Sequence, residues 1–256
     1  KYNLHEALVN SGIIRDWFVE FADYWTNCLS GRKITIQDFH WLHGNYRARR
    51  QITEKLEWAS ETQHVENWQD YRNIADVFNH VYKYSLMPIR EARFDVMLPR
   101  QHCCVLEYGC GMAPMYRTYK KYFYYLQAKW QLADIQSFNF HFTRHAYAKD
   151  IDLDRFITIK PGEMLRCFEN APDNSYDLII AQEVFEHLRY PIESIKVLTR
   201  LLKPEGFLYF DYCDSKGYGL DTSQAVDERK AVLDFVRSNY KIASGKLGDT
   251  VIAVRN

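Results

Sequence analysis

Residues 103–114 read Cys-Cys-Val-Leu-Glu-Tyr-Gly-Cys-Gly-Met-Ala-Pro, and this stretch decides the fold. Its first half is a short apolar run that predicts a buried strand leading into Gly109 and Gly111. A helix is expected directly afterwards, because the first turn of a helix tolerates a proline without loss. Glycines at such a turn let the backbone approach a ligand, and the free amides of the helix start favour an anionic group such as a carboxylate. A tight strand-to-helix turn without any ligand would have a similar sequence.

The sequence after this stretch predicts an α/β fold. Short apolar runs alternate with amphipathic ones, which is typical of a parallel sheet with crossover helices. The runs predicted as strands are residues 103–107, 130–135, 156–160, 177–181 and 206–212. The stretches predicted as helices are residues 114–127, 137–148, 191–202 and 223–238. A Lys-Leu-Gly-Asp turn predicts a final antiparallel hairpin, formed by residues 241–245 and 250–254.

The sequence before this stretch is predicted to be helical. Apolar side chains recur at helical intervals over residues 5–30, and Gly31 follows as a C-terminal cap. Thr35 starts a second helix, since an acid three residues later completes a capping pattern. A third helix is expected over residues 65–84, and no strand is predicted in this part of the chain.

These patterns divide the chain into a helical lobe, residues 1–100, and an α/β domain, residues 101–256. The carboxyl edge of such a sheet needs a lid, so we expect the lobe to close over this edge and to form a binding pocket there. The lobe is rich in aromatic side chains. Some of them could flank a flat or sugar-like ligand, but we expect more than half to belong to the core of the lobe. They are Trp17, Tyr24, Trp25, Trp41, Trp58 and Trp68. The lobe also carries a run of basic residues, Arg47, Arg49, Arg50 and Lys55. This run could bind a phosphate group of a ligand, but a solvated helix face is the simpler interpretation.

The composition describes a globular protein and excludes several classes. The chain has 256 residues with 33 Lys+Arg against 33 Asp+Glu, so its formal net charge is zero, and we do not expect nucleic acid as a partner. No apolar run approaches the roughly 20 residues that a membrane helix needs. The start has no basic-then-apolar leader, and the 6 cysteines show no CxxC spacing, so we expect free thiols and a cytoplasmic location.

Two acids strengthen the case for a nucleoside ligand at the glycine turn. Asp134 is predicted to end the second strand, where a carboxylate can accept both ribose hydroxyl hydrogens; a solvated strand-end acid is the alternative. Glu163 follows the third strand and could border an adenine, or lie in an exposed loop. Pro114 replaces the third glycine of a dinucleotide-binding GxGxxG. The turn therefore favours a compact ligand with an amino-acid tail over a pyrophosphate.

Residues 103–114 resemble the first motif of class I S-adenosylmethionine-dependent methyltransferases. The likeness extends to residues 174–188 (Asn-Ser-Tyr-Asp-Leu-Ile-Ile-Ala-Gln-Glu-Val-Phe-Glu-His-Leu) and to residues 201–210 (Leu-Leu-Lys-Pro-Glu-Gly-Phe-Leu-Tyr-Phe), which resemble the fourth and fifth strands of that family. The resemblance covers about residues 100–256. It implies a seven-stranded Rossmann-like sheet whose last strand is antiparallel, with the cofactor lying over the carboxyl edge.

The same resemblance implies positions for the cofactor. Carried over by position, three residues would line the methionine end of S-adenosylmethionine: Glu107, Gly109 and Gly111. Asp134 would hold the ribose, Glu163 would border the adenine, and Gln182 would lie beside the sulfonium. The sequence departs from the family at residues 112–114, Met-Ala-Pro, where a third small residue or glycine is usual.

The segment Glu183-Val-Phe-Glu186-His187 is the expected catalytic region, because it directly follows the fourth strand. His187 could act as a general base near neutral pH, with Glu183 beside it. The segment also matches the ExxEH arrangement of metal-dependent O-methyltransferases, in which a divalent ion holds the substrate oxygens, since positions i, i+3 and i+4 of a helical turn share a face. The RNA enzymes of that type bring another histidine from further along, and none follows His187 here. We therefore assign no metal ligand, and leave open the possibility that His187 only braces the sheet.

The sequence thus predicts an S-adenosylmethionine-dependent methyltransferase that O-methylates a small molecule, such as a sugar or a secondary metabolite. One alternative is an RNA methyltransferase with an ExxEH metal site, and another is a non-catalytic module that binds the nucleoside. A second histidine pair, His141 and His145, lies four residues apart on a predicted helix and is better explained by packing than by a metal.

Overall fold

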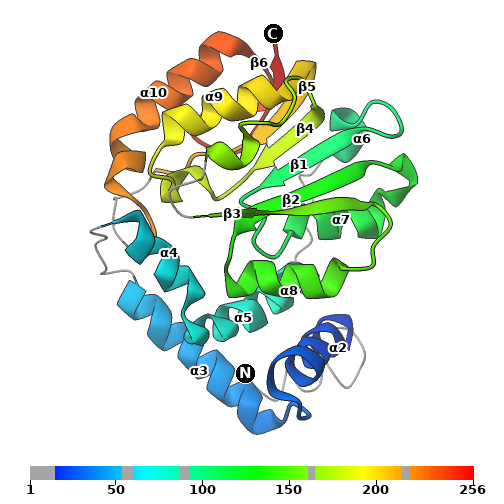
Figure 1. Ribbon diagram of the computed structural model, residues 1–256, viewed down its shortest axis with the longest axis vertical. Coiled ribbons are helices and arrows are strands. Elements are labelled where there is room, and N and C mark those ends of the chain that lie inside the picture. Colours follow the sequence, from blue (N-terminus) through cyan, green and yellow to red (C-terminus); the bar gives the residue numbers. More distant parts are fainter. Residues whose placement is uncertain (1–14, 54–59, 87–92, 161–164, 215–218) are drawn as a thin grey trace.

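The computed structural model describes residues 15–53, 60–86, 93–160, 165–214 and 219–256 (Figure 1). Glu163 lies outside the described residues, so its predicted role stays a prediction. None of the helices in these ranges combines the length and the apolar character needed to cross a membrane.

The centre of the molecule is one seven-stranded sheet in the order β3-β2-β1-β4-β5-β7-β6. Its strands are β1 (Cys104–Tyr108), β2 (Lys129–Ile135), β3 (Leu153–Ile159), β4 (Tyr176–Ala181), β5 (Leu202–Phe210), β6 (Tyr240–Gly245) and β7 (Val251–Arg255). The first five strands are parallel, and β7 pairs antiparallel with both β5 and β6. This arrangement confirms the predicted Rossmann-like sheet and its final hairpin.

Helices cover both faces of the sheet because the central strands are apolar on both sides (Figure 1). One face packs against α9 (Pro191–Leu201) and α10 (Ser223–Asn239) through residues such as Ile195 and Val232. The opposite face is covered by α6 (Phe94–Met97), α7 (Pro114–Tyr122) and α8 (Phe138–Tyr147). The two hydrophobic layers fix the sheet and hold its carboxyl edge in place.

Several boundaries differ from the predicted ones, and two of these differences have a clear local cause. The helix predicted over residues 114–127 ends at Tyr122 and continues as a short 3₁₀ turn, η3 (Tyr124–Leu126). Gln127 then adopts a left-handed conformation, with φ of 52°, which turns the chain into β2. The predicted fifth strand, 206–212, instead begins at Leu202, because the segment before Gly206 already pairs beside β4.

The helical lobe is built from α2 (Arg15–Asp23), the π-helix η1 (Tyr24–Ser30), α3 (Ile36–Thr53), α4 (Glu61–Gln69), η2 (Tyr71–Asn73) and α5 (Ile74–Leu86). The predicted caps are confirmed: Gly31 is left-handed, and the Thr35 hydroxyl accepts the amide of Asp38 while the Asp38 carboxylate accepts that of Thr35. The single helix predicted over residues 65–84 is wrong. Asp70 is extended there, and its carboxylate caps the next turn by accepting the Arg72 amide.

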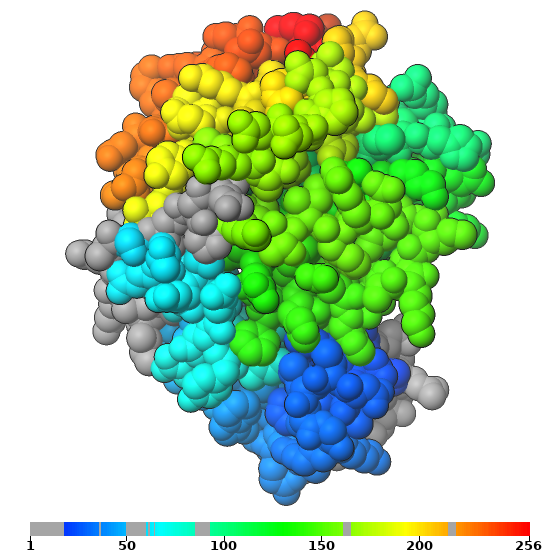
Figure 2. Space-filling model, in the orientation of Figure 1, coloured from blue at the N-terminus to red at the C-terminus, as the bar shows by residue number. Residues whose placement is uncertain are grey.

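The lobe is tied to the α/β domain by both apolar and polar contacts. The lobe core extends into the domain through Met112 and Phe142, and α5 packs against α8. Nδ1 of His141 forms a hydrogen bond with the Tyr24 hydroxyl at 2.7 Å, and Nε2 of His145 lies 2.8 Å from a carboxylate oxygen of Asp23. These two histidines therefore join α8 to the lobe, whose blue and cyan surfaces lie directly against the green of α8 in Figure 2.

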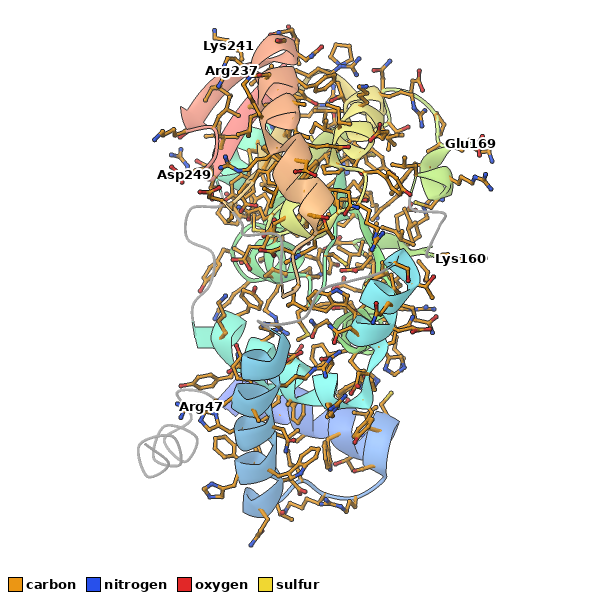
Figure 3. All side chains as sticks on the ribbon, turned by 90° about the vertical axis from the view of Figure 1, so that its left-hand side faces the viewer. Arg47, Lys160, Glu169, Arg237, Lys241 and Asp249 are labelled. Atoms are coloured by element: carbon orange, nitrogen blue, oxygen red, sulfur yellow. The ribbon has the colours of Figure 1, made fainter. Side chains whose placement is uncertain are left out.

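The basic run of α3 does not form one surface. Figure 3 shows Arg47 at the outside of the lobe, in keeping with a solvated face. Arg49 is buried, and its guanidinium donates to the side chains of Asn73 and Asn67. Arg49 is therefore a structural residue, because its donors are already used by the lobe. The side chains of Arg50 and Lys55 lie outside the described residues.

Candidate functional site

The predicted site residues that the structure describes lie at the carboxyl edge of the sheet, where parallel strands β1, β2, β4 and β5 all end. The glycine turn follows β1, Asp134 lies at the end of β2, and Gln182 follows β4 directly as a half-buried residue. The pairing of β1 with both β2 and β4 brings these three segments side by side. The helical lobe reaches the same edge through Met112.

The glycine turn is held by hydrogen bonds to the neighbouring strand. The amides of Gly109 and Cys110 both donate to the carbonyl of Ala133 in β2, at 2.8 and 3.1 Å. Gly109 is left-handed, with φ of 67°, and an added Cβ would lie within 2.8 Å of Cγ1 of Val184. Glycine is thus required at position 109 because the loop after β4 packs against the turn.

The Met-Ala-Pro departure has a structural explanation. Ala113 takes the left-handed conformation, with φ of 50°, directly before Pro114 opens α7. The turn keeps its shape without a third glycine, at the cost of about 1–2 kcal/mol for an alanine with positive φ. Met112 is buried in the lobe core. The residues that differ from the family pattern therefore connect the glycine turn to the lobe.

Glu107 lies beneath the turn and is almost completely buried. Its carboxyl oxygens accept the amides of Met115 and Tyr116, at 3.3 and 3.0 Å, so it caps the start of α7. Burial raises the pKa of Glu107 to about 8, although the two amides act in the opposite direction. The side chain supports the turn from within, and a contact with the methionine end of a cofactor stays a prediction.

Asp134 has the geometry expected of a ribose ligand. One carboxylate oxygen accepts the Gly111 amide at 2.5 Å and the other accepts the Ile135 amide at 2.6 Å. A carboxylate has about four lone-pair sites, so one further acceptor site remains on each oxygen. Burial raises the pKa of Asp134 to about 6. Around Gly111, a Cβ would have only the Asp134 oxygen near it, at 4.0 Å, so the turn leaves room beside the carboxylate. These residues fit an adenosyl ligand.

The ExxEH segment does not form the single helical turn that the sequence predicts. Glu183 is exposed and left-handed, with φ of 52°, and its amide donates to a carboxyl oxygen of Asp211 at 2.7 Å. The 3₁₀ helix η5 (Phe185–His187) starts only afterwards. Glu186 and His187 therefore belong to a different local structure from Glu183. In the ranges that the structure describes, no group of three or more His, Cys, Asp or Glu side chains has the geometry to hold a metal ion.

His187 is oriented by the segment that precedes α10. Its Nδ1 lies 3.0 Å from the carbonyl oxygen of Leu220 and 3.2 Å from a carboxylate oxygen of Asp221. Because a carbonyl only accepts, Nδ1 carries a hydrogen, and Nε2 of the neutral ring carries the lone pair. Burial acts to lower the pKa of His187, but the hydrogen bond with Asp221 and the charge of Glu186 outweigh it and raise the pKa.

Sequence reasoning missed Asp211 and Tyr84, and it left open which of the aromatic side chains of the lobe reach this site. Asp211 follows β5 and is buried; burial, together with the charges of nearby glutamates, raises its pKa to about 7. Its place after an apolar strand was the available signal. Trp68 of α4 lies edge-on to the His187 ring, with centroids 5.8 Å apart, and Tyr84 of α5 is close enough to Glu183 for that charge to raise its pKa, after burial. Only the tertiary structure brings these two lobe aromatics to the sheet edge.

Two other groups of aromatic side chains have structural roles. The Tyr212 hydroxyl donates to the carbonyl of Ala225, so this residue is part of the core beneath α10. The aromatic and basic run of α7 packs Tyr116 and Tyr119 against Trp130 of β2, so these rings belong to the core.

This chain resembles known methyltransferases in both sequence and structure. Residues 46–237 match the family described as Methyltransferase domain. No curated protein sequence matches the chain. An O-methyltransferase family protein from Burkholderia thailandensis is structurally similar, with a TM-score of 0.52 and 14% identity over 86% of this chain and 69% of that one.

Two further solved structures have lower similarity. A SAM dependent methyltransferase from Aquifex aeolicus has a TM-score of 0.42 and 15% identity, over 75% of this chain and 97% of that chain. The cyclase SpnF has a TM-score of 0.43 and 14% identity over 59% of this chain, which spans 55% of the length of SpnF.

The family match covers most of the chain, including part of the lobe, and the sheet order and the glycine turn agree with it. The family also implies S-adenosylmethionine as the cofactor, which the Gly111–Asp134 geometry fits. The chain belongs to the class I S-adenosylmethionine-dependent methyltransferase superfamily.

Proposed function

We propose that this protein transfers the methyl group of S-adenosylmethionine to a hydroxyl oxygen of a small molecule, such as a sugar or a secondary metabolite. One observation carries the proposal. The Nδ1–H of His187 is fixed by Leu220 and Asp221, which leaves the lone pair of Nε2 available at the sheet edge that also holds Asp134. The charge of His187 also acts on the pKa of Asp134, after the larger effect of burial, so the two groups lie within electrostatic reach of each other.

The residues of the chain have separate roles in this reaction. S-adenosylmethionine supplies an activated methyl group when it is bound. Asp134 accepts the ribose hydroxyls, and Gly109 and Gly111 shape the turn beside it. Nε2 of His187 would take the proton of the acceptor hydroxyl as that oxygen is methylated. Asp221 holds the imidazole in orientation and stabilises its protonated form.

The lobe supports a small acceptor. Trp68 and Tyr84 stand at the edge of the sheet beside His187 and Glu183. Aromatic side chains that approach from α4 and α5 exclude water from the reacting atoms, and a net charge of zero offers no broad attraction to a nucleic acid.

The decisive experiment follows methyl transfer from radiolabelled S-adenosylmethionine to a panel of hydroxylated small molecules, with mass spectrometry of the product. The wild-type protein is expected to form a methyl ether. His187→Gln removes the base and is expected to lower kcat by about 10²–10⁴-fold. Its affinity for S-adenosylhomocysteine should remain unchanged, because His187 does not hold the cofactor.

His145→Gln is the matched control, since His145 contacts Asp23 at the lobe junction and lies outside the site. It is expected to retain wild-type transfer. Unchanged activity of the His187→Gln variant would remove the base from the mechanism. Tight cofactor binding without transfer to any acceptor would instead favour a non-catalytic nucleoside-binding module.

A further inference from the structure

Four carboxylates gather on the acceptor side of the site, around the ends of β4 and β5. We call them the acidic cluster: Glu183, Glu186, Asp211 and Asp221. Across the described residues, no lysine or arginine forms an ion pair with any of them, and His187 is the partner of Glu186 and Asp221. This cluster is negative in a chain whose net charge is zero.

Glu186 is the most informative member because it is buried and incompletely paired. Its side chain is 8% exposed, and Oε2 has no hydrogen-bond partner among the residues that the structure describes. Oε1 lies 3.9 Å from Nε2 of His187, beyond hydrogen-bonding distance. A buried carboxylate oxygen without a partner costs free energy, so its retention calls for a group that satisfies it.

The members of the cluster act on one another. Burial raises the pKa of Glu186, and the charges of Asp221 and Glu183 raise it further against the opposing effect of His187. Burial also raises the pKa of Asp211 to about 7, with Glu186 and Glu183 adding to the effect. The orphaned oxygen of Glu186 is therefore part of a site in which a positive charge would be stabilised by several carboxylates at once.

Two aromatic side chains of the lobe lie near the acidic cluster. Trp68 contacts the His187 ring, and Tyr84 lies within electrostatic reach of Glu183. Carboxylates facing aromatic rings form a favourable environment for an organic cation, because the faces of the rings add a cation–π attraction. A neutral sugar has no comparable use for this combination.

We propose that the acidic cluster is a subsite for a protonated amine on the acceptor, so that the substrate carries both an ammonium group and the hydroxyl to be methylated. This inference rests on the proposed function. An ammonium nitrogen has no lone pair, so carboxylates that hold it in the charged form keep it from receiving the methyl group. They also fix the position of the hydroxyl relative to His187.

The experiment measures equilibrium binding to the full chain saturated with S-adenosylhomocysteine, and uses matched probes that differ in charge. The pairs are tyramine against tyrosol and ethanolamine against ethylene glycol, at about pH 8, where an aliphatic amine is still charged. EDTA is present, so that no divalent ion contributes to the preference. The ammonium member of at least one pair is expected to bind at least about tenfold more tightly than its neutral counterpart.

Variants then assign the preference to the cluster. Glu186→Gln retains the shape of the side chain and is expected to weaken binding of the ammonium probe by about tenfold, without changing that of the neutral probe. Asp211→Asn is the second variant and is expected to have the same effect. Glu169→Gln is the matched control, because it removes one negative charge from an exposed position on the outside of the domain, as Figure 3 shows, and should leave both affinities unchanged.

A protein that binds S-adenosylhomocysteine yet discriminates within neither pair would overturn the amine subsite and leave the proposed function standing. The same holds if Glu186→Gln and Asp211→Asn both retain the wild-type preference. Failure to bind S-adenosylhomocysteine would overturn the proposed function and this inference with it.

Discussion

The two halves of the site satisfy their polar groups in different ways. On the cofactor side, the carboxyl groups of Glu107 and Asp134 each accept two backbone amides from the chain itself. On the proposed acceptor side, Glu186 keeps an oxygen that no described residue satisfies. The contrast suggests that folding alone satisfies the proposed cofactor half, whereas the proposed acceptor half keeps an oxygen that a substrate would satisfy.

The largest expected effect tests how rigid the cofactor half is. Gly109→Ala forces a left-handed alanine against Val184 and is expected to lower the free energy of unfolding by about 2–4 kcal/mol. Denaturant unfolding measures the loss. Gly44→Ala is the control, because Gly44 lies inside α3 with nothing within 4 Å of an added Cβ, and alanine should stabilise that helix by up to about 1 kcal/mol. Equal stability of the two variants would show that the turn adapts.

The next largest effect is expected at Asp134. Its carboxylate accepts an amide of the glycine turn and is also predicted to accept the ribose hydroxyls. Asp134→Ala removes the acceptor of the Gly111 amide, and with it the carboxylate proposed to accept the ribose hydroxyls. Affinity for S-adenosylhomocysteine is expected to fall by about 1–3 kcal/mol, which isothermal titration calorimetry measures. Asp234→Ala on the exposed part of α10 is the control and should bind normally. Unchanged affinity of the Asp134→Ala variant would refute the ribose assignment.

The smallest of these effects is a shift in pH dependence on the acceptor half. The base form of His187 is the neutral imidazole, and its raised pKa places the acidic limb of the kcat profile above the ordinary value for histidine. Activity therefore falls as pH decreases through that pKa. Asp221→Asn removes a group that raises the pKa and is expected to move the limb to lower pH. Asp234→Asn serves as the control, and an unmoved limb in the Asp221→Asn variant would separate Asp221 from the base.

The acceptor half could be predicted from the sequence only in part. The segment after β4 pointed to His187, because a residue that directly follows a parallel strand lies at the carboxyl edge. The helical spacing of Glu183, Glu186 and His187 was misleading, since Glu183 leaves the helical conformation to donate its amide to Asp211. The spacing of residues within one segment cannot predict a hydrogen bond to the side chain of Asp211, which lies 28 residues further along the chain, directly after β5.

The helical lobe shows the same limit. Local signals at Gly31 and Thr35 identified helix ends correctly, because caps depend on neighbouring residues. Arg49 looked like part of a solvated basic face, but three helices meet around it and use its donors. Burial of a charged residue depends on such packing, and no local sequence pattern determines it.

The sequence by itself determined the order of strands and helices, the glycine turn after β1 and the acid at the end of β2. Alternation of apolar runs and backbone requirements at a tight turn are local properties, so a linear pattern carries them. The tertiary structure alone decided that Ala113 adopts a left-handed conformation in the glycine turn, that Asp221 orients His187, and that Trp68 reaches the site. These contacts join residues far apart in the chain, and only the packing of the lobe and of α10 against the sheet edge brings them together.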